Sequence, residues 1–176
     1  MNSSSSSNFF YSNVRRLGAS DVDAFRLVRL EALRNDPAAF GSTFEKESSE
    51  PVQFFVDRLI RNAIFGGFVG DGLVGVAGFC AVAGTKLSHK GILWGMYVRP
   101  EARGSGLADA LVETLLEHAA KEVEQVQLTV VVSNPRARRF YQRMGFVEYG
   151  VEKRALKHNG VYFDEVLMVK FLNRKE

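Results

Sequence analysis

The sequence predicts a mixed α/β fold in a single domain. Strand-like and helix-like patterns alternate along the chain, and a glycine-rich turn over residues 98–108 joins a strand to a helix. The 176 residues and the 46% hydrophobic content suit one domain with a substantial core. We place this domain at residues 13–176. Residues 1–12 contain a serine tract, which predicts a disordered leader or tag remnant.

The first half of the chain predicts a strand, two helices and a hairpin. Pro51 is at home in the first turn of a helix, and Asp71-Gly72 is a favoured pair for a tight hairpin turn. Ser20 or Asp21 is a good helix N-cap. In chain order we expect a strand over 13–17, a helix over 21–35, a polar connection over 36–50, a helix over 51–62, and a hairpin of 67–70 with 73–82.

The second half predicts two strand–helix units and a final hairpin. Leu107, Leu111 and Leu115 lie on one helical face, and the apolar end of the strand that follows indicates burial. In chain order we expect a strand over 92–98, a helix over 106–121, a strand over 126–132, a short helix after Asn134, and a hairpin of 146–156 with 162–171 closed at 158–160.

The glycine-rich turn is the first candidate binding site. Such a turn at a helix start presents free backbone N–H groups beside the positive end of the helix dipole, an arrangement that binds phosphate. A nucleotide-triphosphate loop needs a lysine after its last glycine, but Leu107 and Ala108 follow Gly106. A dinucleotide fingerprint would place Asp109 where a small residue is needed. The remaining pattern is Arg-x-x-Gly-x-Ala, which begins at Arg103.

A second motif lies between residues 134 and 146. Asn134 and Pro135 favour a helix start, and Gly145 favours a helix end. The run Asn-x-x-Ala-x-x-Phe-Tyr-x-x-x-Gly-Phe in this segment, together with the pattern at Arg103, resembles the GNAT superfamily of N-acetyltransferases. The specific motifs cover 98–108 and 134–146, and the order of elements resembles the family from about 13 to 171.

The resemblance implies a twisted, mostly antiparallel central sheet, flanked by helices, with one parallel strand pair that splays apart to admit the pantetheine arm of acetyl-CoA. Gly95 marks either a bulge that starts the splay or a place that makes room for a neighbouring ring. The implied coenzyme-binding residues are Met96, Tyr97, Val98, Arg103, Gly104, Ser105, Gly106, Leu107, Ala108, Asn134, Ala137, Tyr141 and Arg143.

The resemblance also implies catalytic roles. Tyr141 is the expected general acid that protonates the leaving thiolate, and backbone N–H groups near Met96 are the expected donors to the developing oxyanion. Many relatives carry a glutamate base on the strand that spans 92–98 here, but this strand has no acidic residue. Glu45 is the first candidate base because the loop after the first helix borders the acceptor site in the family. Glu47 and His89 are the alternatives, and all three read as surface or loop-capping residues.

Charged residues gather in two segments. Residues 134–143 contain four arginines and no acid, whereas residues 36–50 contain four acids and one lysine. We expect the basic segment to face coenzyme phosphates and the acidic segment to attract a cationic amine, unless either is simply a solvated face. The net charge of +3 gives no broad basic surface for nucleic acid, and no apolar run is long enough to span a membrane.

The sequence thus predicts an acetyl-CoA-dependent N-acetyltransferase. The acceptor is a primary amine: a small cationic amine, an amino acid, or a protein N-terminus or lysine. The alternative is a non-catalytic module that binds acetyl-CoA on the same fold. We expect no metal and a monomer or homodimer. We also expect a cytoplasmic location, because the single cysteine, Cys80, allows no internal disulfide.

Overall fold

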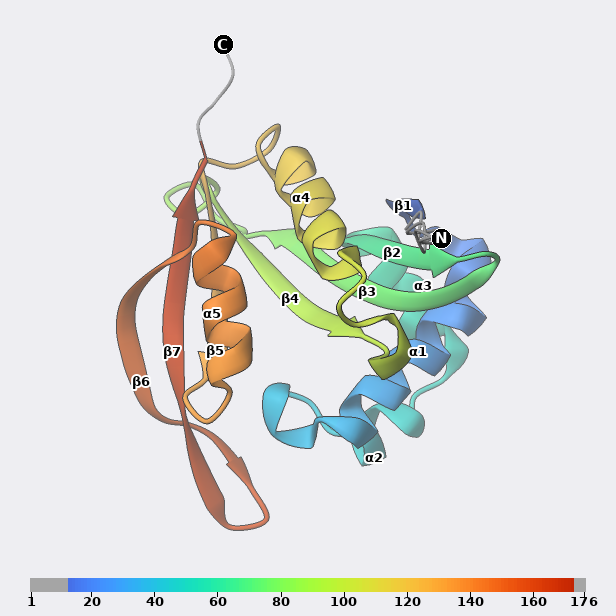
Figure 1. Ribbon diagram of the computed structural model, residues 1–176, viewed down its shortest axis with the longest axis horizontal. Helices are drawn as coiled ribbons and strands as arrows, with labels where there is room; N and C mark the ends of the chain where they lie inside the picture. Colours follow the sequence, from blue (N-terminus) through green and yellow to red (C-terminus); the bar gives the residue numbers. More distant parts are fainter. Residues whose placement is uncertain (1–12, 173–176) are drawn as a thin grey trace, which may run out of the picture.

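The computed structural model describes residues 13–172 and contains a seven-stranded sheet in the order β1-β2-β3-β4-β5-β7-β6 (Figure 1). Every neighbouring pair is antiparallel except β4 with β5, which is parallel. The expected mixed sheet with one parallel pair is therefore confirmed. The leader or tag expected at 1–12, and residues 173–176, lie outside the described residues.

The elements alternate much as the periodicity predicts. Three short 3-10 turns, η1 (Ala19–Asp21), η2 (Pro37–Ala39) and η3 (Pro100–Ala102), stand before helices or loops. The strands are β1 (Asn13–Arg16), β2 (Ala63–Val69), β3 (Gly72–Ala81), β4 (Lys90–Val98), β5 (Gln125–Val131), β6 (Val147–His158) and β7 (Val161–Phe171). The helices are α1 (Val22–Asn35), α2 (Phe44–Ser48), α3 (Val52–Arg61), α4 (Leu107–Ala119) and α5 (Pro135–Arg143).

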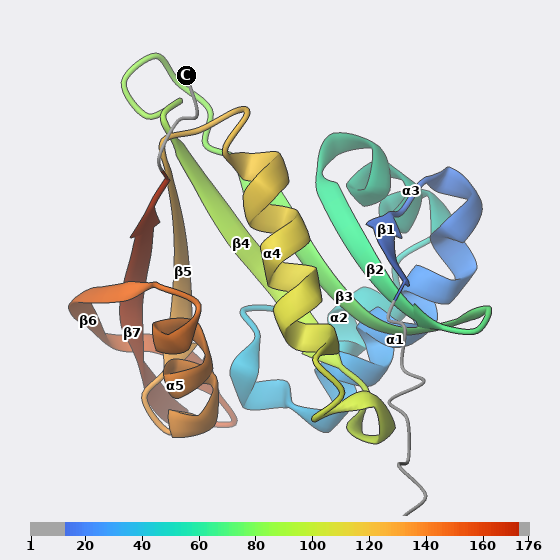
Figure 2. The ribbon, with the colours of Figure 1, turned by 45° about the horizontal axis from the view of Figure 1, so that its top comes forward.

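Helices cover both faces of the sheet, and each face has its own apolar core. On one face, α1 and α3 pack on β2 and β3 around Phe25, Phe55 and Ile64. On the other face, α4 and α5 pack around Leu111 and Tyr141 (Figure 2). The sheet therefore separates an α4/α5 face from an α1/α3 face, and any opening between its strands connects the two.

Such an opening begins in β4. The parallel ladder with β5 pairs only Lys90–Ile92 with Gln125–Gln127, so from Leu93 onward β4 has no strand on that side. Gly95 has a φ of +64°, and the register with β3 shifts at this point, as a β-bulge requires. The bulge reading of Gly95 is confirmed, and the bulge lies just beyond Ile92, the last β4 residue that pairs with β5.

Some predicted boundaries were wrong. The connection over 36–50 is not wholly irregular, because it contains η2 and α2, the latter capped by Thr43. Strand β2 begins at residue 63 rather than 67, since a run rich in glycine and phenylalanine gave no clear start. The hairpin turn lies at Gly70-Asp71, where Gly70 takes a positive φ, one residue earlier than predicted.

Candidate active site

The turn before α4 has the geometry of an anion site. Gly104 and Gly106 both adopt positive φ, +75° and +86°, which other residues rarely take. A Cβ placed on either glycine would meet nothing within 4 Å, so both border open space. The helical ladder starts with the N–H of Ala110 donating to the carbonyl of Gly106 at 3.1 Å. The amides of Ala108 and Asp109 precede that ladder at the positive end of the helix.

A cleft of about 720 Å³ starts at this turn and runs along the open edge of β4 to α5. Its lining includes most residues expected to bind the coenzyme: Met96, Tyr97, Val98, Arg103, Gly104, Gly106, Ala108, Asn134, Ala137, Tyr141 and Arg143. Two expected residues do not line it. The Ser105 hydroxyl donates to the Ala102 carbonyl at 2.6 Å, and the Leu107 side chain is buried in the core. Periodicity alone could have placed Leu107 in the core.

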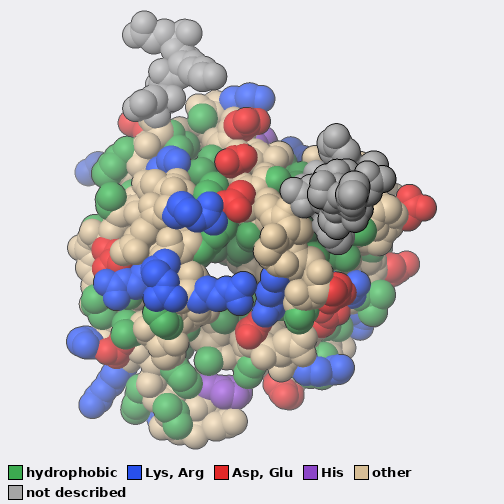
Figure 3. Space-filling view, in the orientation of Figure 1, with side chains coloured by type: hydrophobic (Ala, Val, Ile, Leu, Met, Phe, Trp, Pro, Cys, Tyr) green, Lys and Arg blue, Asp and Glu red, His purple; other side chains and the backbone are tan. Residues whose placement is uncertain are grey.

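Arginines surround the entrance to this cleft. Arg103, Arg136, Arg139 and Arg143 line it, and Figure 3 shows Lys and Arg side chains on both sides of the hollow in this face. Arg143 also pairs with Asp109 at 2.6 Å, which offsets the acid beside the phosphate-binding turn. Arg138 does not belong to this group, because Glu148 of β6 captures its guanidinium.

Helix α5 carries Tyr141 into the cleft. The Asn134 side chain accepts a hydrogen bond from the Ala137 amide at 3.0 Å, Pro135 starts the helix, and Gly145 has a φ of +88° beyond its end. The predicted cap residues are thus confirmed. Tyr141 packs on Phe140 and Phe146 and is buried, and this burial raises the pKa of its hydroxyl above the ordinary tyrosine value. The hydroxyl therefore stays protonated at neutral pH and can donate a proton.

A smaller cavity of about 110 Å³ continues from the cleft through the splay. The two cavities share Phe40, Met96 and Tyr141, so they form one path. The smaller one also touches Trp94, which packs with the α1/α3 core, and Thr129 of β5. The path thus runs from the α4/α5 face, where Tyr141 lies, to the opposite face of the sheet. Phe40, on η2's C-terminal side, was missed because it sits in a segment that read as a polar connection.

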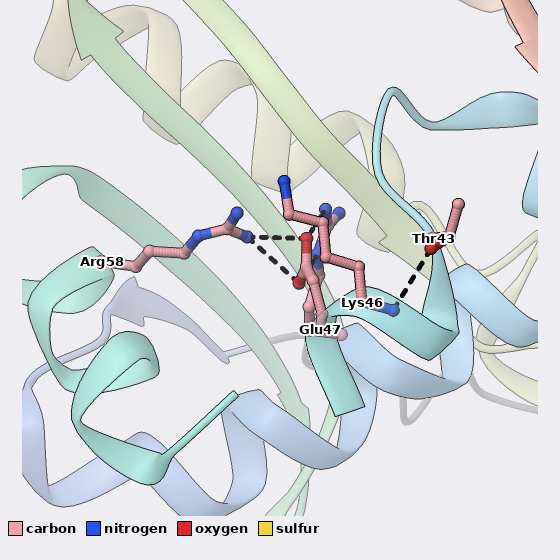
Figure 4. A network of polar contacts seen from close by, with 5 residues as sticks. Thr43, Lys46, Glu47 and Arg58 are labelled. Atoms are coloured by element: carbon pink, nitrogen blue, oxygen red, sulfur yellow. Dashed lines mark hydrogen bonds and ion pairs between the residues drawn. The ribbon is translucent and has the colours of Figure 1, made fainter. Parts of the chain in front are cut away.

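Two of the four acids of the 36–50 segment are paired with arginines. Asp36 lies 3.7 Å from Arg103, and Glu47 is fully buried between Arg29 and Arg58, at 2.8 and 3.2 Å. Figure 4 shows Arg58 reaching Glu47 beside the Thr43 cap of α2. Burial opposes the charge of Glu47, but the two guanidinium groups outweigh it and lower its pKa. The prediction that Glu47 is a surface residue was wrong.

Glu45 lies elsewhere on the same short helix. Its side chain is exposed and does not line either cavity. Its role as a base stays a prediction. His89 lies in the loop before β4, where its carbonyl accepts from Glu124 and Gln125, and it is also absent from both linings.

The comparisons with known proteins agree with this fold and site. Residues 29–146 match the acetyltransferase (GNAT) family model, so the chain belongs to that family. A spermidine N(1)-acetyltransferase of Vibrio cholerae is 32% identical over 94 residues, which cover 50% of this chain and 54% of that enzyme. The chain thus matches about half the length of this curated relative.

Solved structures share the fold across nearly all of the chain. A GNAT-family acetyltransferase of Streptococcus pneumoniae has a TM-score of 0.80 at 21% identity, covering 92% of this chain and 99% of the other. A phosphinothricin acetyltransferase of Sinorhizobium meliloti, solved in complex with acetyl-CoA, has a TM-score of 0.77 at 20% identity over 92% and 88%. Within residues 13–172 no helix is long and apolar enough to cross a membrane, and no cluster of His, Cys, Asp or Glu could hold a metal ion.

Proposed function

We propose that this protein transfers the acetyl group of acetyl-CoA to a primary amine. The observation that carries the proposal is the continuous path from the α4 N-terminus, along the unpaired edge of β4, to Tyr141 and through the sheet. A phosphate-binding turn at one end and a buried hydroxyl in the middle suit a long phosphorylated thioester. The open far end suits the approach of an acceptor.

Different residues along this path have different proposed roles. The amides at the start of α4, together with Arg103, Arg136 and Arg139, are suited to hold the phosphates by charge-assisted hydrogen bonds. The backbone of β4 from Met96 to Val98 offers hydrogen-bonding groups that no strand uses on that edge. An N–H group from this edge is suited to the developing oxyanion, and such a donor typically contributes about 10²- to 10³-fold to the rate.

Tyr141 is the proposed general acid. It stands where the coenzyme cleft and the smaller cavity meet, and its buried hydroxyl is protonated at neutral pH. It can give that proton to the departing thiolate. The spermidine N(1)-acetyltransferase relative supports an amine as the acceptor class. Two of the four acids of the 36–50 segment, Asp36 and Glu47, are paired with arginines, which weakens the argument from charge for a cationic acceptor.

A thiol-release assay tests this function. The protein is incubated with acetyl-CoA and panels of polyamines, amino acids, aminoglycosides and peptides, and free thiol is followed with a chromogenic disulfide. We expect turnover with at least one amine and a mass increase of one acetyl group on that amine. Tight coenzyme binding without turnover on any acceptor would contradict the transferase and support the non-catalytic module.

A further inference from the structure

The acceptor amine must lose a proton before it attacks, and the acids expected for this task do not line the path. The acids that line the larger cavity, Asp36 and Asp109, lie beside Arg103 and Arg143. Another acidic side chain, Glu165, lines neither cavity but contacts a residue that does. The hydroxyl of Thr129, a residue that lines the smaller cavity, donates a hydrogen bond to Glu165 Oε1 at 3.0 Å. Glu165 lies on β7, far from both sequence motifs.

The strand register fixes the side of the sheet on which Glu165 stands. Val131 of β5 pairs with Glu165, and Thr129 is two residues from Val131, so all three side chains share one face. The alternate residues Val130 and Val166 are paired on the other face and lie in the core that contains Tyr141. Glu165 and Tyr141 are thus on opposite faces of the sheet, and Thr129, which hydrogen-bonds to Glu165, lines the same smaller cavity as Tyr141.

The surroundings of Glu165 favour the uptake of a proton. No Lys, Arg or His within residues 13–172 forms an ion pair with it, unlike Glu47. The group facing it from β6 is Glu152, its register partner and a like charge, and the β5 positions beside it are the uncharged Thr129 and Val131. Partial burial and the charge of Glu152 raise the pKa of Glu165, against the opposing effect of the Thr129 hydrogen bond.

We propose that Glu165 is the general base, taking a proton from the acceptor ammonium on the face of the sheet opposite Tyr141. This role rests on the proposed transfer of acetyl to an amine. The ammonium gives one proton to Glu165, and the free amine forms the N–C bond. The C–S bond then breaks as the thiolate takes the Tyr141 proton. After the attack the nitrogen still carries two protons, and it loses one of them through solvent to the deprotonated Tyr141. Glu165 then releases its proton to solvent, so one proton leaves per turnover.

Three variants, Glu165→Gln, Thr129→Val and Glu152→Gln, test this assignment. For each, kcat/KM is measured as a function of pH with the best amine from the panel. In Glu165→Gln we expect a loss of about 10²- to 10⁴-fold at neutral pH with coenzyme affinity unchanged. The rate should keep rising with pH toward the pKa of the amine itself, because only amine that is already deprotonated can attack. Glu45→Gln, which removes the rival candidate base, is measured alongside.

The other two variants keep the carboxylate and shift its pKa in opposite directions. Thr129→Val removes a hydrogen bond that favours the charged form, so the acid limb of the profile should move to higher pH. Glu152→Gln removes a like charge, so the acid limb should move to lower pH while kcat stays near wild type. A residue that only supports the fold would not produce opposite shifts, and these variants decide the question even if Glu165→Gln fails to fold.

The outcomes separate the two proposals. Wild-type protein that binds coenzyme but acetylates no amine overturns the transferase function and the role of Glu165 together. Wild-type turnover that Glu165→Gln retains with an unchanged profile overturns Glu165 alone. Loss of turnover in Glu45→Gln instead, with the profile rising toward the amine pKa, would give the base to Glu45.

Discussion

The two ends of the path are built in different ways. The coenzyme end consists of two continuous segments, 98–108 and 134–146, whose glycines, cap residues and helix starts set the backbone directly. The proposed acceptor end combines Phe40, which follows η2, with Trp94 of β4 and Thr129 of β5. Glu165 of β7 joins it through a hydrogen bond from Thr129. A site built from backbone geometry suits a ligand that is the same in all members of a family. Side chains from separate elements, by contrast, can be substituted one at a time. The difference suggests why a shared coenzyme site can accompany diverse acceptors.

The largest effect is expected from removing the hydroxyl of Tyr141, which lies between the two ends. Tyr141→Phe should lower kcat by about 10²- to 10⁴-fold and leave coenzyme affinity near wild type, because only the proton donor is lost. Burial holds the pKa of Tyr141 above the working range, so its titration should not shape the wild-type profile.

Steady-state kinetics with calorimetry of coenzyme binding provide the measurement for Tyr141. Tyr149→Phe on β6, an exposed tyrosine, is the matched control. If kcat is unchanged in Tyr141→Phe, and a pre-steady-state burst shows that product release is not limiting, then Tyr141 is not the acid.

A second prediction compares two glutamates on one short helix. Glu47→Gln leaves two guanidinium groups, one of them deeply buried, without their anion and should cost about 3–5 kcal/mol of unfolding free energy. Glu45→Gln, on the exposed side, should change it by less than about 0.5 kcal/mol. Urea denaturation followed by circular dichroism measures both.

The same pair has a pH signature. The pKa of Glu47 is lower in the folded protein than in the unfolded chain, where it is about 4.3. Its stabilisation is therefore complete above that unfolded value and is lost as pH falls through the folded one. Glu47→Gln should lose less stability than wild type on acidification, and equal losses would show that the ion pair does not titrate in this window.

The smallest predicted effect sharpens the role of the phosphate-binding turn. Gly106→Val should weaken coenzyme binding by at least about tenfold, because the side chain enters the open space before α4 and the positive φ is strained. Gly84→Val is the control, since Gly84 also has a positive φ, +109°, and open space but lies in a loop outside both cavities. Equal coenzyme affinities in the two folded variants would remove this turn from the binding site.

The sequence predicted the local backbone geometry of the two motifs well because its signals are local. Positive φ at Gly106 and the Asn134 cap depend on neighbours a few residues away, so the motifs carry their own geometry. The bulge at Gly95 was one of two readings that periodicity could not separate. The register with β3 decided it.

The surroundings of Glu47, Glu165 and Arg138 could not be predicted, because they depend on contacts between residues that are distant in the sequence. Glu47 looks solvated in a polar run, and its burial is decided by Arg29, which lies 18 residues earlier. Glu165 becomes significant only through Thr129, 36 residues away across the β5–β7 ladder. Arg138 faces β6 rather than the cleft because Glu148 competes for it, which a helical wheel of α5 alone does not include.

The short parallel ladder between β4 and β5 has a mechanical consequence. The ladder has three paired positions at one end and none beyond, so the part of the sheet formed by β1 to β4 and the part formed by β5 to β7 pair only at that end. An extended ligand that hydrogen-bonds to the free edge of β4 would take the place of a strand there and would fix the two parts of the sheet relative to each other. Trp94 of β4 and Thr129 of β5 both line the smaller cavity, and they belong to different parts of the sheet. We therefore expect the acceptor pocket to reach its working shape only after the coenzyme is seated, which imposes an order of binding on the two substrates.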